Sequence, residues 1–170
     1  MTWNAYNRRK EVLREILAIA DQRRDFSITD LLDTVDGGRE AYANETELLF
    51  DLQMTWFQRL SGQLDRLLID GVDTPEIMAI TAWVNAAGEM PGARALLDAE
   101  LSNPALGKAF AKELTLLAAS AGVPANHPDL NGHGKRLRDS ARESVVYTDI
   151  VVEDAPQTGS LLNKLRFRAA

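Results

Sequence analysis

Apolar residues recur at three- and four-residue steps along most of the chain, and the longest run of this pattern lies between Asn44 and Gly71. Asn44 is a helix-capping residue, and Glu47 stands three positions later, at capping-box spacing. Gly71 is suited to end the helix. The pattern therefore predicts an amphipathic helix roughly 40 Å long, whose apolar face other segments must cover. The residues of that face are Leu48, Leu49, Leu52, Trp56, Leu60, Leu64, Leu67 and Leu68.

The same spacing predicts helices before and after this one, separated by glycine and proline. A short connection from Arg39 to Ala43 precedes the long helix. The pattern thus indicates an all-α bundle of six or seven helices with an extended C-terminal tail. We divide the chain into short N-terminal helices at 1–43, a bundle body at 44–144 and the tail at 145–170. The other predicted helices cover residues 5–24, 27–35, 74–89, 93–102, 104–121 and 135–144, with a loop at 123–134.

The tail differs in composition from the bundle. After Ser144, valine, isoleucine and tyrosine dominate as far as Val152, which is typical of a β-strand. A second apolar group, from Leu161 to Phe167, is interleaved with cations and could form an amphipathic turn. Such segments can bind the edge or groove of a partner, or fold back on this bundle or on a second copy. The partner-binding candidates are Val146, Tyr147, Ile150, Val152, Leu161, Leu162, Leu165 and Phe167.

Composition narrows the classes of function. The 170 residues fit one domain, contain no cysteine and have a formal net charge of -6. No apolar stretch is long enough for a membrane span or a standard secretion signal, so we expect a cytoplasmic protein. Between residues 25 and 51 the acidic side chains outnumber the single Arg39, and this balance repels a phosphate backbone. The acidic residues are Asp25, Asp30, Asp33, Asp36, Glu40, Glu45, Glu47 and Asp51.

The side chains capable of catalysis or metal binding form no recognised motif. His127, Asp129 and His133 share one loop, but a structural zinc site needs four ligands and their spacing matches no common signature. We therefore predict no catalytic residue, no metal site and no cofactor, and hence a protein that is not an enzyme. A set of apolar residues could line a ligand pocket between helices, although core packing is the interpretation we favour. These are Trp56, Met78, Trp83, Met90 and Phe110.

The segment from Tyr42 to Leu49, which reads YANETELL, resembles a motif of TetR-type regulators. In that family an aromatic-x-Ser/Asn-Lys-Glu-x-Leu-Leu segment joins a DNA-binding head to a ligand-binding, dimerising body. The resemblance implies a homodimer that pairs through residues 104–121 and 135–144. Two features depart from the family. Few residues separate Leu31 from Tyr42, where the family has a recognition helix, and Glu45 replaces the family's lysine.

Two functions follow as hypotheses. The first is a non-enzymatic regulatory or adaptor protein with a TetR-like body, which binds a protein partner through its C-terminal tail. The second is a divergent TetR-like transcriptional regulator that binds DNA and an apolar small ligand near Trp83. DNA binding would use the cations of the N-terminal helices, which are Arg8, Arg9, Lys10 and Arg39. A small-ligand carrier without DNA binding is a third class, and it rests only on the aromatic and methionine content.

Overall fold

A computed structural model of the chain describes residues 3–23, 25–71 and 74–153, and within these ranges it contains helices and no strands. The all-α prediction is confirmed. The described residues form eight α-helices rather than six or seven, because a four-residue helix forms in the connection before the long helix. The elements are α1 (Trp3–Gln22), α2 (Ile28–Thr34), α3 (Gly38–Ala41), α4 (Glu45–Ile69), α5 (Pro75–Glu89), α6 (Pro91–Ala99), the 3-10 helix η1 (Pro104–Leu106), α7 (Gly107–Ser120) and α8 (Leu130–Glu153).

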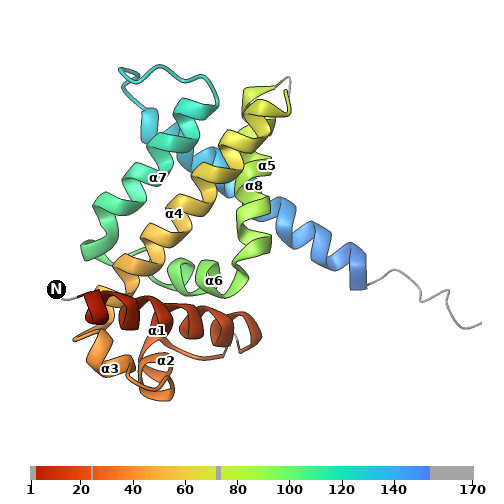
Figure 1. The fold of residues 1–170 in the computed structure, drawn as a ribbon. Helices are drawn as coiled ribbons and strands as arrows, with labels where there is room; N and C mark the ends of the chain where they lie inside the picture. The colour runs from red at the N-terminus through yellow and green to blue at the C-terminus, as the bar shows by residue number, and fades with distance from the viewer. Residues whose placement is uncertain (1–2, 24, 72–73, 154–170) are drawn as a thin grey trace, which may run out of the picture.

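The helices form two tiers (Figure 1). Helix α1 crosses the amino end of α4, with α2 and α3 on its far side, and these three helices make a small N-terminal head. Above them α4, α5 and α7 run together, and α8 packs against both α5 and α7. The short α6 lies between the tiers and packs along α1.

Local signals set most helix ends as predicted. The Ser27 side chain and Asp30 form a complete capping box at α2. At α4, Asn44 Oδ1 accepts a hydrogen bond from the Glu47 backbone N–H at 3.0 Å, which is the first half of the predicted box. The carboxylate of Glu47 instead lies 3.3 Å from Arg9 Nη1, so an ion pair replaces the other half. Gly71, with φ of 75°, follows the end of α4.

The apolar face predicted for α4 is largely buried, and it lies in one continuous core with residues of α1, α2, α5, α6, α7 and α8. Leu68, in the last turn of α4, is the exception, with 69% of its surface exposed. Helix α5 lies inside the bundle as its composition predicts, although Ile77 in its first turn is 56% exposed.

Gly92 and Asp21 join the two tiers. Gly92 packs so closely on α1 that a Cβ atom there would clash with the backbone of Ala20. Its N–H donates to Asp21 Oδ1 at 2.8 Å, so a side chain of α1 caps the start of α6. The head is therefore attached to the body by direct backbone contact.

Two predictions about the C-terminal third are wrong. Helix α8 begins at Leu130, inside the predicted loop, because Gly134 serves close packing rather than a turn: a Cβ atom there would clash with the Leu114 carbonyl oxygen. The same helix continues through residues 145–152, which were predicted to be β-prone and to begin an extended tail. Extending an existing helix avoids the cost of nucleation, which outweighs the small penalty of β-branched residues. Residues 154–170, with Leu161, Leu162, Leu165 and Phe167, lie outside the described residues.

Candidate functional site

The five predicted pocket residues lie in the core. Trp56, Met78, Trp83, Met90 and Phe110 are each at most 7% exposed. The rings of Trp56 and Trp83 meet edge to face, with centroids 5.5 Å apart. Trp83 also lines an open pocket at the surface of the body. The structure thus brings two of the five together beside a pocket and places the others in the apolar core.

Glu113 of α7 is buried beside these two indoles, with 1% of its surface exposed. Its carboxylate accepts hydrogen bonds from Trp83 Nε1 at 3.2 Å and from Gln53 Nε2 at 3.0 Å. Arg94 Nη1 lies 3.5 Å from Oε1 of the same carboxylate. A buried carboxylate is tolerated only when it is paired and hydrogen-bonded, and Glu113 meets both conditions.

Arg94 of α6 is the cationic partner, and only 4% of it is exposed. Its guanidinium lies 4.6 Å from the centroid of the Trp56 ring, and Nη2 lies 2.8 Å from Asp98 Oδ1. Burial lowers the pKa of Arg94, whereas the charges of Glu113 and Asp98 raise it. An arginine stays protonated despite such shifts, so the core contains a permanent cation.

Arg142 of α8 also contacts Asp98 and Trp83. Its Nη2 pairs with Asp98, and its guanidinium lies 5.8 Å from the centroid of the Trp83 ring. The Arg142 Nε atom and all three nitrogens of Arg94 are buried and outside hydrogen-bond geometry with any described partner. A buried donor without an acceptor costs roughly 1–3 kcal/mol of folding stability, so an acceptor placed beside these nitrogens would be favourable.

The pocket opens between α5, α6 and α8 and has a volume of about 300 Å³. Both arginines contribute to its wall, and the remaining wall is mostly apolar. Its lining residues are Trp83, Ala87, Pro91, Arg94, Ala95, Asp98, Arg142 and Val145.

Sequence reasoning missed this cluster, although its signal is present. Glu113 stands three residues after Phe110 and four before Leu117, which are both buried, so its position belongs to the apolar face of its helix. Gln53 likewise lies between the buried Leu49 and Trp56 on α4. A polar residue in core register is a sign of a buried polar network.

The predicted DNA-contact residues are engaged within the head. Arg8 pairs with Asp36 at 2.8 Å, and Arg39 pairs with Asp33 at 2.6 Å. Lys10 Nζ lies 4.6 Å from the centroid of the Tyr6 ring. Arg8 and Arg9 of the basic first helix therefore pair with carboxylates of the acidic stretch after it, although the sequence presents the two as separate features.

Arg9 is held most firmly of these cations. Its Nε donates to Asp51 Oδ2 at 2.7 Å, and its guanidinium covers the Tyr42 ring at 4.3 Å from the centroid. The hydrogen bond that Arg9 donates to Asp51 raises the pKa of Arg9. Tyr42 is fully buried, and its hydroxyl donates to the same Asp51 oxygen at 3.0 Å. The aromatic residue of the resemblance motif therefore fastens α1 to the start of α4.

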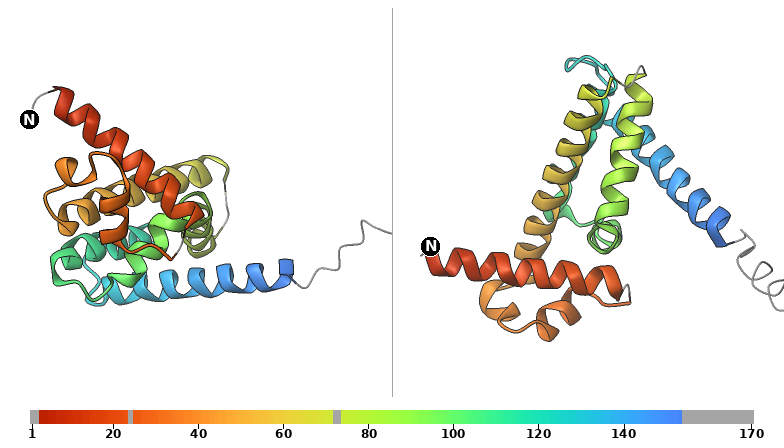
Figure 2. Two further views of the ribbon diagram at one scale, coloured as in Figure 1. Left: turned by 90° about the horizontal axis from the view of Figure 1, so that it is seen from below. Right: turned by 45° about the vertical axis from the view of Figure 1, so that its right-hand side comes forward.

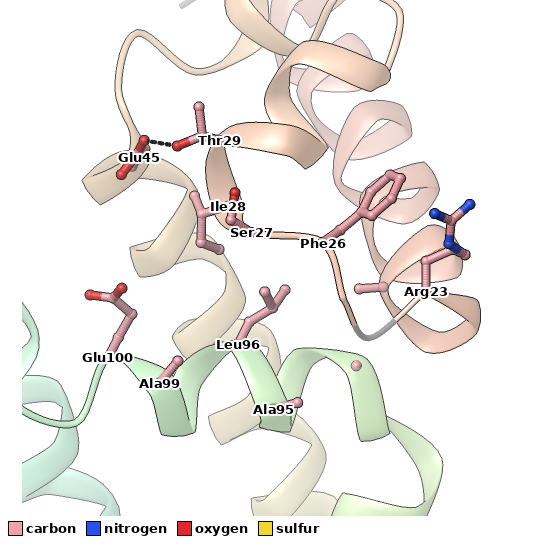
Figure 3. A pocket seen from close by; sticks show the side chains of 12 residues that line it. Arg23, Phe26, Ser27, Ile28, Thr29, Glu45, Ala95, Leu96, Ala99 and Glu100 are labelled. Carbon is pink, nitrogen blue, oxygen red and sulfur yellow. Dashed lines mark hydrogen bonds between the residues drawn. The ribbon is translucent and has the colours of Figure 1, made fainter.

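A second pocket lies at the junction of head and body (Figure 3), with a volume of about 220 Å³. Ala95, Leu96 and Ala99 of α6 face the turn between α1 and α2 across it. Its polar groups are already satisfied, since Glu45 accepts from Thr29 and Arg23 pairs with Asp25. It therefore lacks the unmet donors of the pocket beside Trp83.

The predicted loop that holds both histidines is partly helical, because His127 and Asp129 precede α8 and His133 lies in its first turn. The rings of His127 and His133 meet edge to face at 4.7 Å, and His127 Nδ1 accepts from the Asp129 backbone N–H. The Asp129 carboxylate pairs with Arg136 at 3.2 Å. In the ranges that the structure describes, no three acidic or histidine side chains gather as potential metal ligands.

An apolar groove runs between α4 and α7, with a volume of about 310 Å³. Phe50 and Met54 of α4 are 45% and 58% exposed in it. Lys108 and Lys112 of α7 also line it. Apolar side chains are therefore open to solvent in this groove.

Of the partner-binding candidates, Val146, Tyr147, Ile150 and Val152 fall in the last part of α8. This part of the helix projects away from the bundle in all three views (Figures 1 and 2). Between Leu130 and Val145, the part of α8 whose burial is described, Ala141 is the last fully buried residue, and Val145 packs against the edge of the core.

Comparison of the chain with models of known families, with curated proteins and with solved structures finds no match. Among the helices of the described ranges, none is both long and apolar enough to cross a membrane.

Proposed function

We propose that this protein is a non-enzymatic regulatory or adaptor protein, whose TetR-like helical body presents a C-terminal segment to a protein partner. The observation that supports this most is the course of α8, which runs past Val145 to Glu153 and leaves the bundle (Figure 2). Six of the eight residues from 145 to 152 are apolar by sequence. An apolar segment outside the core is typical of an interaction site.

The helical form of this segment changes the expected mode of recognition. A strand would add to the edge of a partner's sheet, whereas a helix places side chains three and four residues apart in an apolar groove. We therefore propose helix-in-groove binding by residues 145–153, in place of strand addition.

A protein partner suits the head better than DNA does. Association with DNA draws most of its free energy from cations that neutralise phosphates. Arg8, Arg9 and Arg39 already have carboxylate partners, and α3, at the place of a recognition helix, has only four residues. DNA binding would have to break these pairs without a helix long enough to read a groove.

The test is affinity capture from nuclease-treated host lysate by the full chain and by a chain ending at Ser144. The specific variant is Val146→Asp with Ile150→Asp in the full chain, and its control is Lys135→Gln with Arg136→Gln, exposed residues of the same helix. Both pairs change the net charge equally. We expect one protein to be retained by the wild type and the control, and lost from the truncation and the aspartate variant.

Equal capture by the chain ending at Ser144 would refute binding through the C-terminal segment. The alternative, a divergent TetR-like transcriptional regulator, predicts instead a DNA affinity that falls steeply with salt and is lost on reversing the charges of Arg8, Arg9 and Lys10. Sedimentation of the wild type would test the homodimer that the resemblance implies.

A further inference from the structure

The pocket between α5, α6 and α8 has the features of a built ligand site. Arg94 lines it while being 4% exposed, and none of its three nitrogens has a hydrogen-bond acceptor in good geometry. Its volume of about 300 Å³ lies at the lower end of the roughly 300–1,000 Å³ usual for small-ligand sites. A fold that buries a cation without satisfying its donors has retained an unfavourable arrangement unless something supplies the acceptors.

Almost all of the buried side-chain atoms that lack a hydrogen-bond partner in the described residues are donors. Among buried side-chain atoms without a partner in the described residues, the three guanidinium nitrogens of Arg94, Arg142 Nε and the indole nitrogen of Trp56 are donors. Gln53 Oε1 is the one acceptor in this group. A ligand that satisfies the group must therefore bring acceptors.

The carboxylates already present do not meet this need. Glu113 is occupied by Gln53 and Trp83, and Asp98 is shared between Arg94 and Arg142. Asp139 lies 3.9 Å from Arg142, but it also pairs with Lys135 and Arg138. Asp98 and Glu113 thus lie within ion-pair distance of the two guanidinium groups, but the three nitrogens of Arg94 and Arg142 Nε still have no acceptor in hydrogen-bond geometry.

We propose that this pocket binds a small organic carboxylate with a compact apolar body, its carboxylate meeting Arg94 and Arg142 and its body lying against Trp83. A planar guanidinium fork matches the two oxygens of a carboxylate, and the charge makes these hydrogen bonds stronger than neutral ones. The apolar part would lie on the indole and on the alanine and proline side chains of the wall. This binding is independent of the proposed protein partner.

Benzoate is the probe, benzamide its neutral isostere and inorganic phosphate the test for general anion binding. Each is titrated into the full-length protein by calorimetry and by tryptophan fluorescence. We expect benzoate to bind about tenfold or more tightly than benzamide or phosphate, as a charge-assisted pair implies. Trp83→Phe should remove most of the fluorescence response, while Trp3, which is 74% exposed, remains as an internal reference.

Arg142→Gln should weaken benzoate binding about tenfold or more, because it removes one charged donor group while leaving Arg94 and Glu113 in place. Arg136→Gln is the matched control on the same helix, since Arg136 pairs with Asp129 away from the pocket, and it should leave binding unchanged. Thermal melting of both variants confirms that they are folded. Equal affinity for benzoate and benzamide, equal affinity for phosphate, or no difference between the two variants would overturn the proposal, as would no binding of benzoate at all.

Discussion

Replacement of Glu113 by leucine tests the buried cluster most directly. The carboxylate accepts from Gln53 and Trp83 and neutralises Arg94, so its removal orphans two neutral donors and a buried cation. Breaking a buried ion pair by removing one partner costs roughly 3–5 kcal/mol. A domain of this size loses roughly 2–4 °C of melting temperature per kcal/mol. We therefore expect Glu113→Leu to lower the melting temperature by about 10 °C, with a matching loss in the free energy of unfolding.

The assay is urea unfolding followed by circular dichroism and by tryptophan fluorescence, so that loss of helix and loss of core packing are compared. Glu40→Leu is the control, because Glu40 is exposed at the surface of the head. Its effect should stay within about 0.5 kcal/mol. The double variant Arg94→Met with Glu113→Leu removes both charges, and it should recover most of the loss, since apolar replacement of a whole buried pair is often neutral or stabilising.

Two results would contradict this reasoning. A loss below about 1 kcal/mol for Glu113→Leu would mean that Arg94 does not depend on this carboxylate. A double variant as unstable as Glu113→Leu alone would mean that the cost comes from lost packing rather than from an unpaired charge.

Three further predictions concern packing, anchoring and pH. Gly134→Ala should destabilise the protein by about 1–3 kcal/mol in urea unfolding, because the added methyl group pushes α8 off the backbone of α7. Gly62→Ala, at a helical site with open space around it, should instead stabilise the protein by about 0.5–1 kcal/mol, and equal effects of the two variants would contradict the close packing at Gly134. Tyr42→Phe removes one hydrogen bond and should cost about 1 kcal/mol, measured in the same way. The hydrogen bond from Arg39 lowers the pKa of Asp33, so its contribution is present above the unfolded value near 3.8 and is lost as the pH falls through the lower folded value. Asp33→Asn should therefore show a smaller loss of urea midpoint below about pH 4 than the wild type, and an identical loss would count against the pair.

The ends of the helices were predictable from the sequence because their signals are local. Asn44 caps α4 through a backbone N–H three residues away, and Gly71 ends it through its own left-handed conformation. Pro75 opens α5 for the same kind of reason, since a proline needs no acceptor for a missing N–H. The start of α6 was predicted at Ala93, whereas the helix begins at Pro91. Interactions within one helical turn do not depend on how the helices are arranged.

The sequence by itself determined an all-α bundle, the limits of its long central helix and the apolar faces that had to be buried. Only the tertiary structure decided which charges meet. Arg9 reaches Asp51 across 42 positions of sequence, and Gln53 reaches Glu113 across 60. Such pairs, and the packing of Gly134 against a neighbouring helix, depend on the relative placement of whole helices. Placement is set by burial summed over many side chains, so a local pattern could not reveal the ion pairs within the head or the donor-rich pocket at Arg94.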